Sequence, residues 1–137
     1  MADAPRITVT ERHGRRCAGS GSPFEPVIGY ARAVRSGDFI AVSGTVGINP
    51  DGTYPPTAGE QARRALAIAR AAIEALGGRL QDVIRTRIFV ADIARDNEAV
   101  GRAHGEVFGE IRPACTMVQA KLISDAALVE IELDAIV

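Results

Sequence analysis

Short stretches in which apolar and polar residues alternate predict most of the strands of this chain. The alternation runs through residues 6–11, 30–44, 83–92, 114–122 and 127–137. Within 30–44 the triplet Ser36–Gly37–Asp38 is typical of a tight turn, so this stretch is predicted to form a β-hairpin. The segments 13–26 and 48–57 are rich in Gly, Pro, Ser or Asp and are predicted to be loops.

Two other stretches have the periodicity of amphipathic helices. In residues 57–78, Thr57 is followed three positions later by Glu60, which is a capping-box pattern, and a glycine pair ends the helix. Its apolar stripe consists of Ala58, Ala62, Ala65, Leu66, Ala69, Ile73 and Leu76. The second helix, over residues 95–109, has a glycine at every fourth position from Gly101, and such a groove is expected to let another backbone approach closely.

The elements follow one another as strand, hairpin, helix, strand, helix and hairpin, which indicates an α+β fold with one mixed or antiparallel sheet. Two helices cover only one face of such a sheet. On the other face we expect Phe89, Met117 and Cys115 together with the acidic residues that alternate along the last strand from Glu130. A face that is both apolar and charged is typical of a subunit interface that holds a polar pocket. The sequence therefore predicts an oligomer with Cys115 and Glu130 on its inward side.

The length of 137 residues is typical of one domain, with residues 1–23 as an N-terminal strand and connector and residues 24–137 as the main unit. A net charge of −1 argues against binding to nucleic acid or to an anionic membrane. Two cysteines without a CxxC pattern favour a reducing cytoplasm over a disulfide framework. The start of the chain lacks the apolar run of a signal peptide. No metal site and no cofactor are predicted.

Several longer stretches resemble one known family. They are IGYARAVRSGDFIAVSGTVGINPDG, the EQARRAL helix, LQDVIRTRIFVADI, AVGRAHGEVFGEIRPA and LVEIELDAIV. From residue 24 onward the chain resembles the Rid (reactive intermediate deaminase, YjgF) family, in a branch with an extended N-terminus. The resemblance implies a chorismate-mutase-like α+β fold and a homotrimer with pockets between its subunits. It also implies hydrolysis of enamines and imines to a keto acid and ammonia, without a cofactor.

The same resemblance assigns roles to three residues. Tyr30 matches the pocket tyrosine of the family, Gly44 matches the turn whose backbone lines the pocket, and Glu130 matches the glutamate that orients the hydrolytic water. We expect Tyr30 and Glu130 to be catalytic and Gly44 to bind substrate. Phe89, on the same predicted face as Glu130, is a further candidate for substrate binding.

The arginine that binds the substrate carboxylate in this family follows a Pro-Ala pair, but here Cys115 follows Pro113 and Ala114. Gly101 and His104 stand where the family has an asparagine and an aromatic residue. A hydrogen bond to a charged group contributes about 1.5–3 kcal/mol, and a guanidinium makes two of them to a carboxylate. Their loss weakens carboxylate binding by about two orders of magnitude or more. The sequence therefore predicts weak activity on 2-imino acids.

Cys115 itself has two interpretations. It is either a nucleophile activated by a basic neighbour, for which His104 is the candidate, or a small residue of the pocket wall. The second interpretation is the plainer one for a lone cysteine. His104 is correspondingly either that base, in contact with substrate, or a packed helix residue.

Two arginines are candidates for replacing the missing anchor. Arg32 lies two positions beyond Tyr30, hence on the same strand face, and is otherwise expected to be solvated. Arg87 is otherwise expected to form a salt bridge. The plainer interpretation of Glu130 is likewise an ion pair, with Arg85 or Arg87.

Three functions are compatible with these residues. The leading hypothesis is a trimeric hydrolase or deaminase that acts on a small imine, enamine or enol-like substrate at the subunit interface. The alternative is a non-catalytic trimer that binds small molecules or acts like a chaperone, which the missing arginine favours. Endoribonuclease activity, also attributed to the family, is disfavoured by the near-neutral charge and by the lack of a basic and aromatic stripe.

Overall fold

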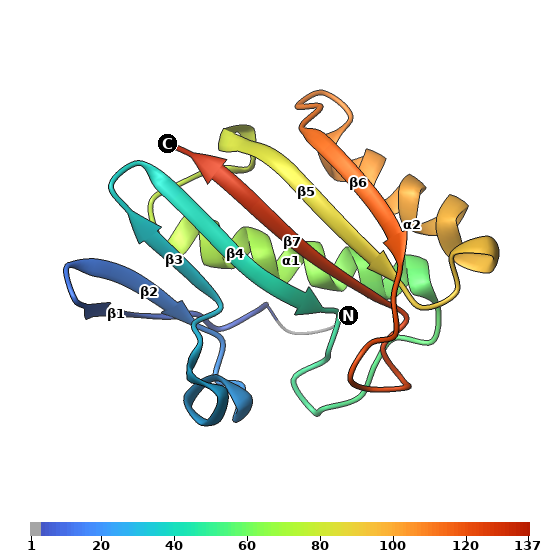
Figure 1. The fold of residues 1–137 in the computed structure, drawn as a ribbon, viewed down its shortest axis with the longest axis horizontal. Coiled ribbons are helices and arrows are strands. Elements are labelled where there is room, and N and C mark those ends of the chain that lie inside the picture. Colours follow the sequence, from blue (N-terminus) through green and yellow to red (C-terminus); the bar gives the residue numbers. More distant parts are fainter. Residues whose placement is uncertain (1–3) are drawn as a thin grey trace.

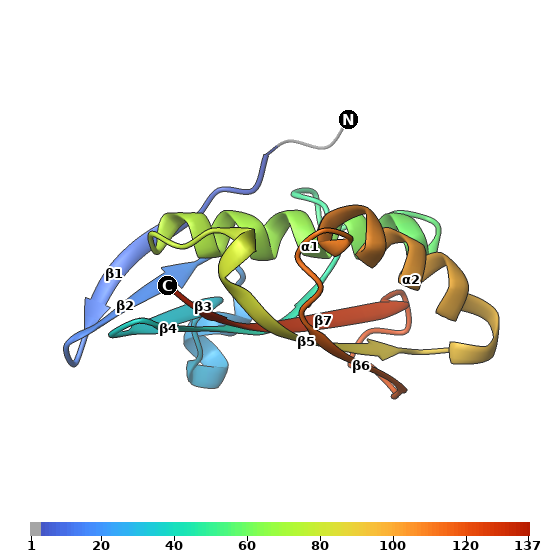
Figure 2. The same cartoon turned by 90° about the horizontal axis from the view of Figure 1, so that it is seen from above.

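A seven-stranded mixed sheet carries both helices on one of its faces, as Figures 1 and 2 show. The computed structural model describes residues 4–137, so residues 1–3 of the predicted N-terminal segment lie outside it. The elements are β1 (Thr8–Arg12), β2 (Arg15–Gly19), the π-helical turn η1 (Glu25–Gly29), β3 (Ala33–Ser36), β4 (Phe39–Val46), α1 (Ala58–Ala75), the 3-10 turn η2 (Leu80–Asp82), β5 (Val83–Val90), α2 (Ile93–Phe108), β6 (Ala114–Gln119) and β7 (Val129–Ile136). The strand order is β1-β2-β3-β4-β7-β5-β6. This arrangement confirms the predicted α+β fold with one covered face.

Helix α1 has the boundaries and the buried face that its sequence predicts. The Thr57 hydroxyl accepts a hydrogen bond from the Glu60 backbone N–H at 3.2 Å, and the Glu60 carboxylate accepts one from the Thr57 N–H at 3.2 Å. Gly77, with a φ of 84°, ends the helix in the left-handed conformation that favours glycine. All seven residues of the predicted stripe belong to the core cluster between the helices and the sheet.

The segment 15–19, predicted to be part of a loop, is strand β2. It pairs with both β1 and β3, and it buries Cys17 and Ala18. His13 and Gly14 form the turn before it, with φ values of 51° and 75°, which is the geometry of a two-residue hairpin turn. The prediction missed this strand because its apolar signal is only two residues long, between an arginine pair and a Gly/Ser run.

The last two strands do not form the predicted hairpin. β6 pairs with β5 in parallel, whereas β7 lies between β4 and β5 and is antiparallel to both. β5, α2 and β6 therefore form a parallel crossover unit, in which the helix covers the strands it connects. The register places Cys115 beside Thr86 and Met117 beside Ile88, and both β5 residues are buried under the helices. Cys115 and Met117 accordingly lie on the helix-covered side, and their predicted place on the open face is wrong.

The groove expected along α2 accepts no other backbone within the described chain. A Cβ atom added at Gly101 or at Gly105 would meet nothing within 4 Å. The apolar side of α2 nevertheless packs against the core, since Val100 and Ala103 are fully buried.

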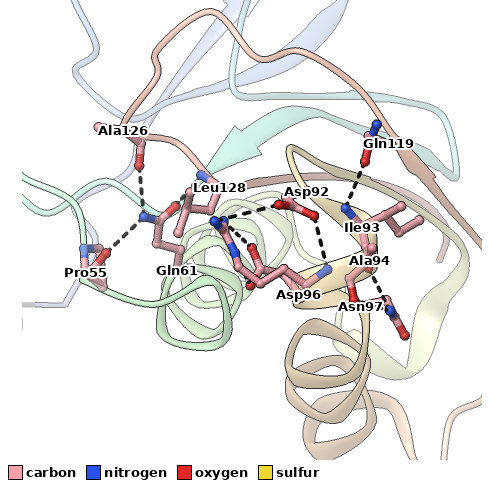
Figure 3. Close-up of polar contacts among 11 residues, drawn as sticks. Pro55, Gln61, Asp92, Ile93, Ala94, Asp96, Asn97, Gln119, Ala126 and Leu128 are labelled. Atoms are coloured by element: carbon pink, nitrogen blue, oxygen red, sulfur yellow. Dashed lines mark hydrogen bonds and ion pairs between the residues drawn. The ribbon is translucent and has the colours of Figure 1, made fainter.

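Gln61 on α1 connects two loops to the helix layer, as Figure 3 shows. Its side-chain nitrogen donates to the carbonyls of Pro55 at 2.9 Å and Ala126 at 3.0 Å, and its oxygen accepts from the Leu128 N–H at 2.8 Å. The end of β4 comes so close that a Cβ atom at Gly47 would lie 2.1 Å from the Gln61 carbonyl oxygen. Gln61 thus fixes the loops before α1 and before β7, and with them the start of the strand that carries Glu130.

The Gln61→Leu variant is expected to lower the free energy of unfolding by about 2–4 kcal/mol, because it leaves three partly buried backbone groups without partners at nearly unchanged volume. Urea denaturation measures this loss. The matched control is Gln119→Leu, which removes a bond to the Ile93 N–H at an exposed position and should cost less than about 1 kcal/mol. Equal losses in the two variants would contradict the role of Gln61.

Candidate functional site

An irregularity in β4 places the backbone of Gly44 against the carboxylate of Glu130. The pairing of β4 with β7 shifts register between Val42 and Thr45, which is the signature of a β-bulge. A Cβ atom at Gly44 would lie 2.7 Å from Oε2 of Glu130, so any other residue there would displace the Glu130 carboxylate. The half-buried Glu130 carboxylate therefore lies against the backbone of the bulge on the open face of the sheet, and we call this place the notch.

Arg32 is buried beside this notch, with an exposed fraction of 6%, so the expectation that it is solvated is wrong. Its Nη1 donates to the Gly44 carbonyl at 2.8 Å and to the Thr45 hydroxyl at 3.0 Å. Its Nη2 donates to the Tyr30 hydroxyl oxygen at 3.0 Å, and its guanidinium carbon lies 5.3 Å from the centre of the Tyr30 ring. One guanidinium thus contacts two of the predicted pocket residues at once.

Glu25, which no sequence pattern indicated as functional, neutralises this arginine. Its Oε2 lies 3.8 Å from Arg32 Nε, and the two side chains are 10% and 7% exposed. The Glu25 carboxylate also accepts hydrogen bonds from the backbone N–H and the hydroxyl of Ser20. Within residues 4–137, Arg32 Nε is the one buried side-chain N or O atom without a hydrogen bond. Residue 25, in the segment 13–26 that was predicted to be a loop, therefore supplies the counter-ion of Arg32.

Burial raises the pKa of Glu130 above its usual value of 4.5. The positive charge of Arg32 opposes this shift, and the negative charge of Glu132 adds to it. A carboxylate whose pKa moves toward neutrality takes up and returns a proton more readily under physiological conditions. Glu130 thus has the electrostatic setting of a general base.

The remaining candidates on the open face are Arg87 and Phe89. Arg87 forms ion pairs with Glu132 at 3.3 Å and with Asp134 at 3.2 Å, which is its salt-bridge interpretation. Phe89 lies beside Glu130 in the register of β5 and β7 and is partly buried. Phe89 thus borders the notch, whereas Arg87 is occupied by acidic neighbours.

Cys115 and His104 lie on the other side of the sheet, under or beside α2. His104 Nε2 is 2.8 Å from the Thr86 hydroxyl, and its ring packs against Phe108 with the ring centres 4.7 Å apart and the planes tilted by 38°. Burial lowers the pKa of His104, and the hydrogen-bond partner of its Nε2 is the Thr86 hydroxyl rather than a thiol. Cys115 is an exposed free thiol. Within one copy of the chain, the Cys115 group and the Tyr30–Glu130 notch therefore do not meet.

A shallow hollow lies elsewhere on the molecule. Its volume is about 430 Å³, and it is lined by Ala91, Gln119, Ala120, Lys121, Leu122, Ser124, Asp125 and Ala127. It contains none of the predicted site residues, so we place the candidate site at the notch, where the polar groups converge. Across residues 4–137, no group of three or more His, Cys, Asp or Glu side chains is placed to hold a metal ion. Over the same residues, neither helix is long and apolar enough to span a membrane.

Comparison with known proteins places this fold among its relatives. The family described as Endoribonuclease L-PSP matches residues 21–137. The crystal structure of a Mycobacterium tuberculosis protein, a member of the highly conserved YjgF/YER057c/UK114 family, superposes with a TM-score of 0.82 at 43% identity. That match covers 90% of this chain and 99% of the other.

Two further relatives are similar in sequence. An uncharacterised protein of Streptomyces coelicolor is 41% identical over 118 residues, which cover 85% of this chain and 87% of that protein. The 3-aminoacrylate deaminase RutC of Acinetobacter baylyi is 34% identical over 113 residues, which cover 81% and 88% of the two chains.

Removing either charge of the Glu25–Arg32 pair is expected to cost about 3–5 kcal/mol, because the remaining charge is left buried and unpaired. The variants Glu25→Gln and Arg32→Gln and their double substitution form a cycle that denaturant unfolding measures. The double variant should be more stable than the sum of the single losses predicts, by more than about 1 kcal/mol. Strictly additive losses would show that the two groups do not interact.

The lowered pKa of His104 predicts a loss of stability in acid. The unfolded chain binds the proton more readily than the folded protein, so the free energy of unfolding falls as the pH drops through about 6.5 and below. His104→Gln should flatten this pH dependence in thermal melts. A slope that persists in His104→Gln would assign it to another group.

Proposed function

Because the chain belongs to the endoribonuclease L-PSP (YjgF/RidA) family, we propose that it hydrolyses a small imine, enamine or enol-like metabolite at the notch of Tyr30, Gly44 and Glu130. The observation that carries this proposal is the convergence of a phenol hydroxyl, a close backbone approach and a carboxylate of raised pKa. The relative named 3-aminoacrylate deaminase supports an enamine-like substrate.

For an imine, the proposed chemistry needs only Glu130, Tyr30 and water. The Glu130 carboxylate takes a proton from water while the water oxygen bonds to the C=N carbon and the π electrons move to nitrogen. Glu130 returns that proton to the nitrogen, which gives a carbinolamine. The hydroxyl proton then passes through Glu130 to the amine as the C–N bond breaks, so that ammonia leaves and a carbonyl remains. Tyr30 donates a hydrogen bond that orients the substrate.

The preferred substrate lacks a carboxylate beside its reacting carbon. Cys115 stands where the family arginine is expected, and the donors of Arg32 are occupied by Gly44, Thr45 and Tyr30. Arg87 is held by two acidic side chains. With these cations occupied, 2-imino acids gain little over uncharged imines.

A homotrimer is part of the proposal, because the notch lies on a sheet face that the helices do not cover. That face exposes large apolar side chains, namely Phe39 at 43%, Val118 at 43% and Ile136 at 50%. Neighbouring copies that cover it would enclose the notch and exclude bulk water. Both cysteines are free thiols, and the reducing cytoplasm is the compartment we propose.

A second candidate function is small-molecule binding without turnover. The missing carboxylate anchor favours it, because a pocket that holds substrate weakly in the reactive orientation gains little from a general base. Cleavage of RNA has no comparable support, since the chain has a net charge of −1 and the notch presents a carboxylate.

The Glu130→Gln variant tests the proposal. Ammonia release is measured with a panel of uncharged imines, enamines and 2-imino acids, and the substitution should lower turnover by about 100-fold or more. Because the carboxylate form is required, wild-type activity should fall as the pH is lowered through the raised pKa of Glu130. The surface control Glu74→Gln should keep full activity. No ammonia above background, or equal rates in Glu130→Gln and wild type, would overturn the proposal.

A further inference from the structure

Arg32 is the buried charged residue of the notch with the most hydrogen bonds, and the proposed reaction gives it no role. Arg32 donates from Nη1 and Nη2 to three oxygen atoms, and its Nε faces Glu25. Burying a guanidinium is costly unless its contacts are good, so an arginine here needs a compensating role.

We propose that Arg32 is the positioning residue that fixes Tyr30 and the Gly44 bulge relative to Glu130, and that Glu25 holds Arg32 in place. The kinetic part of this inference rests on the proposed function. The geometric part does not, because it concerns the arrangement of Tyr30 in the protein without substrate.

The first consequence concerns the direction of the Tyr30 hydroxyl. A phenol has one O–H donor and accepts hydrogen bonds at the same oxygen. Arg32 Nη2 occupies an acceptor site of that oxygen at 3.0 Å. A guanidinium has no acceptor, so the Tyr30 proton cannot point back to Arg32 and is directed elsewhere, toward a substrate atom. Tyr30 is thereby fixed as a donor.

The second consequence concerns the spacing between Tyr30 and Glu130. Nη1 of the same guanidinium binds the Gly44 carbonyl at 2.8 Å, and the Glu130 carboxylate lies against the Gly44 backbone. The planar guanidinium therefore links the Tyr30 hydroxyl, which is the donor of the notch, to the Gly44 backbone. That backbone in turn contacts the carboxylate of Glu130, which is the acceptor. A flexible amine offers no such fixed separation.

The third consequence concerns the N-terminal segment. Glu25 lies on η1, which Figure 2 shows on the opposite side of the sheet from the helices. Ser20, at the end of β2, anchors the Glu25 carboxylate through its backbone N–H at 3.2 Å and its hydroxyl. The segment between β2 and β3 thus contributes to the notch, because it carries Glu25, the counter-ion of Arg32.

A substrate-free measurement tests the geometric part. The chain has two tyrosines, so Tyr54→Phe leaves Tyr30 as the single tyrosine, and its Cζ resonance is observed after ¹³C-tyrosine labelling. In this background Arg32→Gln and Glu25→Gln should each move the resonance, and Arg32→Lys should move it less than Arg32→Gln. The control Arg70→Gln, which breaks an exposed pair with Glu74, should leave it unchanged.

Kinetics on the same variants test the positioning role. Arg32→Gln should lower kcat by about 100-fold while KM changes by less than about threefold, because misplaced groups act on the reactive geometry. Arg32→Lys should recover part of kcat. If Arg32→Gln does not fold, Arg32→Lys and Glu25→Gln carry both measurements.

The outcomes separate this inference from the proposed function. A wild-type protein without hydrolase activity would refute the function, and the Tyr30 resonance would still decide whether Arg32 positions that residue. A folded Arg32→Gln variant with an unchanged resonance and unchanged kcat would overturn the inference. So would a rise in KM confined to carboxylate substrates, because Arg32 would then be a substrate anchor.

Discussion

One buried guanidinium determines how the candidate site is put together. Arg32 bonds to the phenol of Tyr30, to the backbone of the Gly44 bulge and to the Thr45 hydroxyl, and Glu25 balances its charge. An arginine in this position is tolerated because two of its three nitrogen atoms donate hydrogen bonds and Glu25 balances its charge. One planar group thereby fixes three segments of the chain relative to one another, at residues 25, 30–32 and 44–45. Glu130, beside this cation, still has a raised pKa because burial outweighs the attraction.

The parts of the fold that depend on local pattern were predicted correctly. Helix α1 follows from its capping box and apolar stripe, and the hairpin of β3 and β4 follows from the turn at Ser36–Gly37–Asp38. The alternation in β7 gave its two faces, because Val129, Ile131, Leu133 and Ala135 are all buried. In each case the neighbours that decide the structure are close in sequence, or the hydrophobic contrast between two faces is strong.

The prediction failed where residues distant in sequence decide which face or environment a side chain has. β6 is exposed along most of both faces, so alternation alone does not say which residues face the helices, and its parallel register with β5 sets this instead. Cys115 was placed on the wrong face for that reason. Arg32 was expected in solvent because most of its partners come from strand β4 and from the η1 turn. No local signal in the segment 13–26 marks Glu25 as its counter-ion. Family resemblance located Tyr30, Gly44 and Glu130, whereas their connection through Arg32 needed the tertiary structure.

The proposed function and the proposed role of Arg32 together require that an uncharged C=N group binds between the Tyr30 hydroxyl and the Glu130 carboxylate. The most direct measurement is a crystal structure with a small ketoxime, a neutral analogue of an imine, and in parallel with pyruvate. The account predicts the oxime nitrogen within hydrogen-bonding distance of the Tyr30 hydroxyl, the oxime next to Glu130, and Arg32 still bonded to the Gly44 carbonyl. An Arg32 side chain that leaves Tyr30 and binds the carboxylate of pyruvate would contradict it.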